Sequence, residues 1–225
     1  MKAGSPETLL LVSVVVAVIP LILAVGTCYL KFSIVLSMLR SGFGTQQAPS
    51  NSLVMALSVV LSLVVMEPVL RETSERVSEI QLTQAGPTSV FEGAKKLAIA
   101  AEPWRDFLLN HCGERELETF RRLADPHEES AKETAAVESS KSHETPSLAV
   151  ALGAFVLSEI KRGFVIAFFL LIPFFVIDVV VSNLLVSLGL TMLSPVVVTL
   201  PLKILLFITS DGWLLLAKSL VQSYQ

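Results

Sequence analysis

Two long apolar stretches near the C-terminus limit what this chain can fold into more than any other feature. Residues 164–188 form a run of 25 whose only charge is Asp178, and residues 192–210 form a second apolar stretch. A helix rises about 1.5 Å per residue, so about 20 apolar residues cross the roughly 30 Å of hydrocarbon in a bilayer. Gly189 separates the stretches, which predicts a helical hairpin with a tight tip.

The N-terminal part is apolar as well. Residues 9–30 carry no charge and are long enough to span a bilayer, with an expected kink at Pro20. A further run at residues 53–66 stops at Glu67 and Pro68, is short for a span, and is expected to pack on protein instead of lipid.

The charged residues gather between these apolar blocks. Residues 71–147 hold 25 of the chain's 37 charged side chains. The sequence therefore divides into N-terminal hydrophobic helices (1–70), a polar insert (71–147) and C-terminal hydrophobic hairpins (148–225). In the insert we expect two or three short amphipathic helices over residues 72–123, then a flexible linker over residues 125–146 that has almost no large apolar side chain.

The composition indicates an all-α membrane protein. Only 16% of the residues are charged, whereas about a quarter are charged in a typical soluble domain. The net charge of −3, with scattered basic residues, argues against a nucleic-acid partner. Cys28 and Cys112 are expected to be free thiols; a lipidated Cys28 is disfavoured because threonine precedes it.

Four charged residues in the apolar segments need an explanation: Glu159, Asp178, Lys203 and Asp211. An unpaired charge in hydrocarbon costs several kcal/mol, so such groups usually face a partner or water. Structural pairing inside a helical assembly is the favoured interpretation. An ion or proton pathway is the alternative, although no acidic residues recur at helical spacing along one helix.

Little in the sequence indicates catalysis. Asp178 and Asp211 could form an acid–base dyad, but their flanking residues do not match those of intramembrane aspartyl proteases. His111, His127 and His143 lie in the polar insert without metal-ligand spacing, and no nucleotide-binding P-loop is present. We therefore expect no enzyme activity, no metal and no cofactor.

Three motifs carry a family resemblance. They are GTxQAPxN within residues 39–69, PFxxIDxVVSxxL from Pro173, and MLSPVxVxLPxKxLLFxxxDGW from Met192. In this order and spacing they resemble the export-gate family of type III secretion, called SctR in injectisomes and FliP in flagella. With the first helix, the similarity covers about two thirds of the chain and leaves out the polar insert. The single tip methionine and the stretch SEIKRGF favour the injectisome type.

This resemblance implies an assembly. The family forms a pentamer that joins one T-type and several S-type subunits in a pseudo-helical ring and works with U- and V-type export-apparatus proteins. The ring is a gated channel for unfolded substrate proteins at the bacterial inner membrane. Its multi-pass subunits project toward the periplasm once assembled, so their short, proline-broken helices pack on protein.

The resemblance also implies roles for individual residues. Leu190, Thr191 and Met192 match the family's pore constriction, where flexible thioethers form a soft ring. Glu159 and Lys203 match a charged pair that joins adjacent subunits. Asp178 and Asp211 fall at family signature positions without an assigned role. A stand-alone secondary transporter is the alternative function, with a solute site near Asp178 or Lys203.

Overall fold

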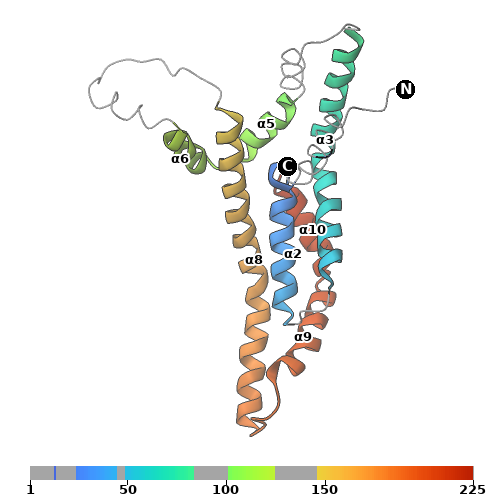
Figure 1. The fold of residues 1–225 in the computed structure, drawn as a ribbon. Coiled ribbons are helices and arrows are strands. Elements are labelled where there is room, and N and C mark those ends of the chain that lie inside the picture. Colours follow the sequence, from blue (N-terminus) through green and yellow to red (C-terminus); the bar gives the residue numbers. More distant parts are fainter. Residues whose placement is uncertain (1–12, 14–23, 45–48, 84–100, 125–145, 225) are drawn as a thin grey trace, which may run out of the picture. The chain divides into compact units, whose positions relative to one another are not determined.

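The computed structural model describes residue 13 and residues 24–44, 49–83, 101–124 and 146–224 (Figure 1). Every regular element in these ranges is a helix, so the all-α prediction is confirmed there. Most of the predicted span at residues 9–30, the insert at residues 84–100 and nearly all of the predicted linker lie outside the described residues. The helices are α2 Tyr29–Gly42, α3 Asn51–Thr83, α5 Glu102–His111, α6 Glu114–Ala124, α8 Leu148–Ser187, α9 Pro195–Thr209 and α10 Gly212–Gln222.

The chain forms two compact units. One comprises residues 28–65 and 160–225, and the other comprises residues 1–27 and 66–159. We call the first the hairpin unit, because it contains the C-terminal hairpin, and the second the insert unit. The division into segments 1–70, 71–147 and 148–225 follows composition and stays a prediction.

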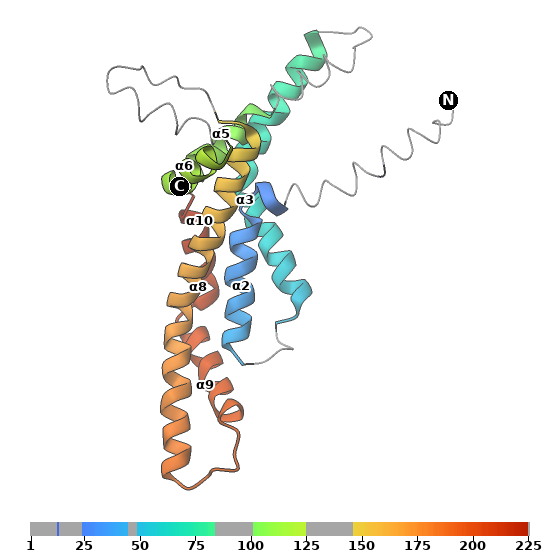
Figure 2. The same cartoon turned by 60° about the vertical axis from the view of Figure 1, so that its left-hand side comes forward.

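The hairpin unit contains α2, the start of α3, most of α8, and α9 with α10. Both ribbon views show α9 running back beside the C-terminal end of α8 (Figures 1 and 2). Along α8 the buried positions recur at steps of four or seven residues, at Gly163, Ala167, Phe174 and Val181, while large apolar side chains on other sides of the helix are exposed. This spacing places one stripe of the helix against protein.

Two helices of the described residues are apolar and long enough to cross a membrane, over Asn51–Ser78 and within α8. α9 and α10 make a third candidate if they are taken together, although a bend of 62° separates them. α8 has 40 residues and is about 60 Å long, twice the hydrocarbon thickness, so only part of it fits within one bilayer.

The expectation that the second apolar run is short for a span is wrong, because the helix over Asn51–Ser78 is long and apolar enough to cross a membrane. α3 continues through Pro68 to Thr83. After Pro68 the helix carries two ion pairs one turn apart: Arg71 lies 3.3 Å from Glu75, and Arg76 lies 2.9 Å from Glu72. Proline removes one backbone hydrogen bond from the helix. The ion pairs lie in the turns after Pro68 and stabilise the helix there.

The insert unit confirms two of the short helices expected there. Pro103 lies in the first turn of α5, where its missing N–H leaves no bond unmade. Trp104 Nε1 donates to the carbonyl of Gly26 at 2.6 Å. The N–H of Gly113, just before α6, donates to Ser158 Oγ on α8 at 2.7 Å. These bonds fix α5 and the start of α6 within this unit.

The core of the hairpin unit includes three phenylalanine side chains, and an exposed tryptophan packs against one of them. Phe43, which follows α2, lies 5.0 Å from Phe174 of α8 and 5.5 Å from Phe207 of α9 between ring centroids. Trp213 of α10 meets Phe207 edge to face at 5.1 Å. Such contacts add stability beyond the apolar area that they bury. Cys28 and Cys112 are not joined in a disulfide, as expected.

Candidate functional site: the C-terminal hairpin

A buried lysine joins three elements of the hairpin unit. Lys203 Nζ on α9 donates to Asp178 Oδ2 on α8 at 2.7 Å and to the carbonyl oxygen of Gly42 at 2.8 Å. The lysine side chain is 4% exposed and the aspartate side chain 42%. The ammonium group has three donors and uses two of them here. Structural pairing, the favoured interpretation of these charges, therefore describes Asp178 and Lys203 within a single chain.

The end of α2 explains how Gly42 takes part. Its carbonyl lies in the last turn, where carbonyls lack partners within the helix and the negative end of the helix dipole attracts a cation. A Cβ atom at Gly42 would meet a terminal methyl group of Leu171 on α8, which would have to move to make room for it. Gly44 then turns the chain with a φ of 78°, which favours glycine. The sequence motif GFG thus ends α2, places Phe43 in the core and offers a carbonyl to Lys203.

The bend between α9 and α10 depends on the residues Asp211, Gly212 and Trp213. Asp211 has a left-handed backbone (φ 51°, ψ 39°), which is uncommon for a residue other than glycine. A Cβ atom at Gly212 would overlap the ring of Phe207. The ring of Trp213 also packs against the Phe207 ring, edge to face. Each residue of the DGW signature therefore contributes to the structure of the bend. No bond described here joins Asp211 to Asp178.

The hairpin tip is a hydrogen-bonded turn. The N–H of Gly189 donates to Val186 O at 3.0 Å, and that of Leu190 donates to Leu185 O at 2.9 Å. With Gly189 at a φ of 73°, these bonds form a Schellman motif, the common glycine-dependent end of a helix. Pro195 then begins α9. The predicted hairpin with a tight tip at Gly189 is confirmed.

The tip presents apolar side chains outward. Met192 is 102% exposed, and Leu190 is 45% exposed. Thr191 between them is exposed as well. None of the described residues covers Met192, and Leu190, Thr191 and Met192 lie on one accessible turn. Their role in a constriction stays a prediction.

Glu159 lies on α8, next to Ser158, and its side chain is fully buried. The predicted bridge between Glu159 and Lys203 concerns two copies of the chain and stays a prediction. Among the described residues, no group of three or more histidine, cysteine or acidic side chains is arranged to hold a metal ion.

Sequence reasoning missed the parts played by Gly42 and Phe207. A signal for Gly42 was present, because it is the first glycine of the pattern GFG, and glycine is common where a helix ends. Phe207 is a fixed position of the motif that begins at Met192, but one phenylalanine among many apolar residues does not show that it contacts a glycine five positions later.

The fold and the site together define a class: an all-helical membrane protein with a C-terminal hairpin that carries a buried ion pair and an exposed apolar tip. The family model that matches residues 11–220 is described as the FliP family. The chain belongs to this family, so the predicted family membership is confirmed.

Curated relatives are similar over nearly the whole chain. The surface presentation of antigens protein SpaP of Salmonella typhi is 38% identical over 207 residues, which cover 92% of this chain and 91% of SpaP. The flagellar biosynthetic protein FliP of Aquifex aeolicus is 36% identical over 96% of this chain and 85% of its own length. The Yop proteins translocation protein R of Yersinia pestis is 36% identical over 96% of this chain and 95% of its own length.

Proposed function

We propose that this chain is a core subunit of a type III protein secretion export gate, of the injectisome type. In this function, five copies join S- and T-type subunits, and the assembly works with U- and V-type proteins. Together they form a gated channel for unfolded substrate proteins at the bacterial inner membrane, with the assembled core projecting toward the periplasm. The subunit makes and breaks no bond. Family membership and the translocation and virulence proteins among its relatives support this proposal.

The observation that carries the proposal is the exposed tip. Met192 is held fully outside its own chain by a turn with a Schellman motif at one end and a proline-started helix at the other. Exposed apolar side chains on a rigid turn suit a surface where several copies converge. A ring of thioethers can close a pore and still yield to varied side chains, because methionine is flexible and polarisable.

We also propose that Glu159 and Lys203 of adjacent subunits form a salt bridge in the assembly. The third N–H of Lys203 is available for such a bond in addition to those to Asp178 and Gly42. Both side chains are buried in the single chain, at 0% and 3% exposure, so assembly must open access to them. Replacing either residue with alanine should then weaken the pentamer.

The decisive experiment is native mass spectrometry of the chain extracted in mild detergent, expressed alone and together with its S- and T-type neighbours. The proposal expects a five-copy species that gains one T-type and several S-type subunits. A stable monomer or dimer that ignores these partners would contradict it and would favour the solute transporter.

The channel itself is tested by conductance of the reconstituted complex. Replacing Met192 with alanine should increase ion leak through the resting gate, whereas Val197→Ala, an exposed apolar position on α9, should leave the leak unchanged. Equal leak from both variants would remove Met192 from the constriction while leaving the assembly result intact.

A further inference from the structure

The side chain of Asn183 on α8 is a polar group with bonds left to make. Four polar residues interrupt the apolar run 164–188: Asp178, Ser182, Asn183 and Ser187. Asp178 is ion-paired, and Ser187 Oγ donates to the backbone carbonyl of Asn183 at 2.8 Å. Among the described residues nothing forms a hydrogen bond with the Asn183 amide group, and the side chain is exposed. The amide therefore has two N–H donors and a carbonyl oxygen available for another molecule.

The surface around Asn183 is aliphatic. Residues three or four positions apart share a face of a helix, so Val179, Val180 and Val186 flank the amide. All three valines are exposed. A surface of this kind usually marks an interaction site, and an amide that is buried without hydrogen bonds costs free energy. A molecule that covers this surface must therefore offer the amide both a donor and an acceptor.

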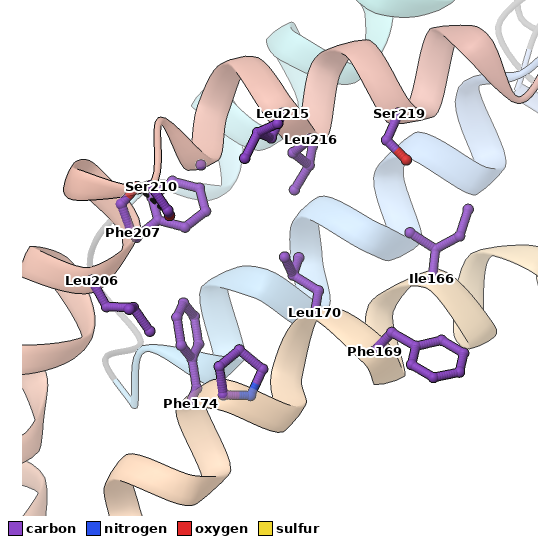
Figure 3. Close-up of a pocket in the computed structure, with 12 residues that line it drawn as sticks. Ile166, Phe169, Leu170, Phe174, Leu206, Phe207, Ser210, Leu215, Leu216 and Ser219 are labelled. Carbon is purple, nitrogen blue, oxygen red and sulfur yellow. Dashed lines mark hydrogen bonds between the residues drawn. The ribbon is translucent and has the colours of Figure 1, made fainter.

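The cavity of the hairpin unit does not serve this amide. The cavity has a volume of about 400 Å³ and lies between α8 and the bent pair α9 and α10 (Figure 3). Its walls are apolar apart from two serines, and Ser210 Oγ donates to the carbonyl of Phe207 at 3.2 Å. The last α8 residue that lines it is Phe174, about two and a half turns before Asn183. The cavity therefore offers the Asn183 amide no partner.

A second copy of the chain offers what lipid does not. Lipid tails carry neither a donor nor an acceptor for the amide. Asparagine has both, so it can pair with the same residue of another copy, and a symmetric ring brings identical residues together near its axis. A single asparagine between apolar helices also fixes their register and the number of helices that associate. The chemistry of Asn183 thus fits an interface between identical chains.

The charge pattern fits such an interface as well. Residues 179–202 contain no charged side chain. A charge in this stretch would be repeated in every copy around a ring, and like charges brought together in an interface repel each other strongly. An amide forms hydrogen bonds between copies without this repulsion.

The surface around Asn183 continues into the hairpin tip. Asn183 lies four residues, about 6 Å along the helix axis, before α8 ends at Ser187. Leu188 is exposed between this position and the exposed tip residues Leu190 and Met192. If the tips of five copies converge, as the proposed function requires, this part of α8 follows directly behind them.

We propose that the Asn183 side chains of neighbouring copies form hydrogen bonds with one another and fix the number of copies in the ring. The flanking valines supply apolar contact, and the amides supply bonds that only one register and one copy number satisfy. This inference rests on the proposed function and adds to it the contact that determines the copy number.

The test compares native mass spectra of the assembly that the full chain forms with its S- and T-type neighbours. Asn183→Asp places a carboxylate in every copy and should lower the fraction of five-copy assemblies at least about tenfold, because like charges meet. Gln222→Glu makes the same chemical change at an exposed residue of α10 and should leave the assemblies intact. Equal five-copy fractions in the two variants would overturn the proposal.

Asn183→Leu separates the hydrogen bonds from the apolar contact. Leucine has a similar volume and lacks the amide, so assembly should persist with a mixture of copy numbers in place of one. Gln222→Leu should keep the single copy number. A single five-copy species from Asn183→Leu would show that the amide does not fix the ring.

The melting temperature of the monomer separates assembly from folding. It should be unchanged in both Asn183 variants, because the exposed side chain has no described bond to lose. A clearly lower melting temperature would mean that the amide makes contacts within its own chain, which contradicts the proposal.

Cysteine crosslinking tests whether the residues meet. A disulfide forms only when the two Cβ atoms lie about 3.5–4.5 Å apart, so Asn183→Cys should give linked pairs of chains when the assembly is oxidised. The parent chain, in which Cys28 is buried and Cys112 belongs to the insert unit, and Gln222→Cys are the controls and should give none. Labelling of Asn183→Cys by a water-soluble maleimide without crosslinks would mean that the residue faces water, and this would refute the contact.

This inference and the proposed function fail in different ways. A chain that forms no multi-copy species would overturn both together. A normal five-copy assembly from every Asn183 variant would overturn the inference and leave the proposed function intact.

Discussion

Lys203 and Asp178 form an ion pair in which the lysine is buried and the aspartate is partly exposed: their side chains are 4% and 42% exposed. Loss of Asp178 leaves a buried ammonium group with the Gly42 carbonyl as its one remaining acceptor among those described. Loss of Lys203 leaves the Asp178 carboxylate without its ion-pair partner, but this carboxylate is partly exposed and is not enclosed by protein. We therefore expect Asp178→Asn to lower the free energy of unfolding by about 1–3 kcal/mol, the usual cost of weakening the hydrogen bond of a buried polar group, because the pair is only partly buried. Lys203→Met should lower it by clearly less.

Thermal unfolding of the purified monomer, followed by tryptophan fluorescence, measures both losses. The double variant Asp178→Asn with Lys203→Met should recover part of the loss caused by Asp178→Asn, because no buried charge remains. Equal losses from the two single variants, or simple additivity in the double variant, would show that the pair is not coupled as the geometry indicates.

Gly212→Ala should destabilise the bend between α9 and α10. The added Cβ atom overlaps the Phe207 ring, and forced overpacking typically costs about 1–3 kcal/mol. Phe207→Leu alone removes the ring contacts with Phe43 and Trp213 and should destabilise too. Adding it to Gly212→Ala should cost less than the sum, and thermal unfolding of the four proteins gives this coupling. A strictly additive result would argue against the contact.

Gly189→Ala tests the free-energy cost of placing an L-residue in a left-handed backbone conformation, without a steric clash of the added Cβ atom. Nothing lies within 4 Å of a Cβ atom at this position, but its φ of 73° disfavours alanine. We expect a loss of about 1 kcal/mol, since a left-handed backbone costs roughly 1–2 kcal/mol in an L-residue. Gly189→Asn should lose less, because asparagine tolerates this region. The order glycine, asparagine, alanine in melting temperature is the expected result; any other order contradicts the turn geometry.

Met192→Ala should leave the stability of the isolated chain unchanged within about 0.5 kcal/mol, the usual effect of a surface substitution. The side chain is fully exposed and has no packing contacts to lose. Phe174→Ala, a buried aromatic control, should cost about 3–5 kcal/mol in the same thermal assay. A clear loss with Met192→Ala would mean that the tip packs on its own chain.

Much of the hairpin could be predicted because its signals are local. Runs of apolar residues separated by Gly189 and Pro195 specify two helices and a turn, since glycine supplies the left-handed residue and proline starts a helix. Pro103 likewise marked the start of α5 correctly. The chain's similarity to its family rests on the same local motifs.

The end of α3 shows where local reasoning failed. The apolar run stops at Glu67 and Pro68 and is by itself short for a span, yet the helix continues to Thr83 with an ion pair between Arg71 and Glu75. A single proline removes one hydrogen bond, and a long helix tolerates that loss when the turns on both sides are stable. The sequence shows both the stop of the apolar run and the charged residues that pair after it, but it does not show which of the two decides whether the helix continues.

The sequence by itself determined that this chain is all-helical and apolar enough for a membrane, and that a glycine turn carries Leu190, Thr191 and Met192. These features follow from periodicity and backbone preferences within a few residues. Only the tertiary structure decided that Lys203 pairs with Asp178 and Gly42, that Phe207 packs against Gly212, and that a cavity lies beneath the bend. Such contacts join residues far apart in the chain, and their partners depend on how helices pack, which no local pattern specifies.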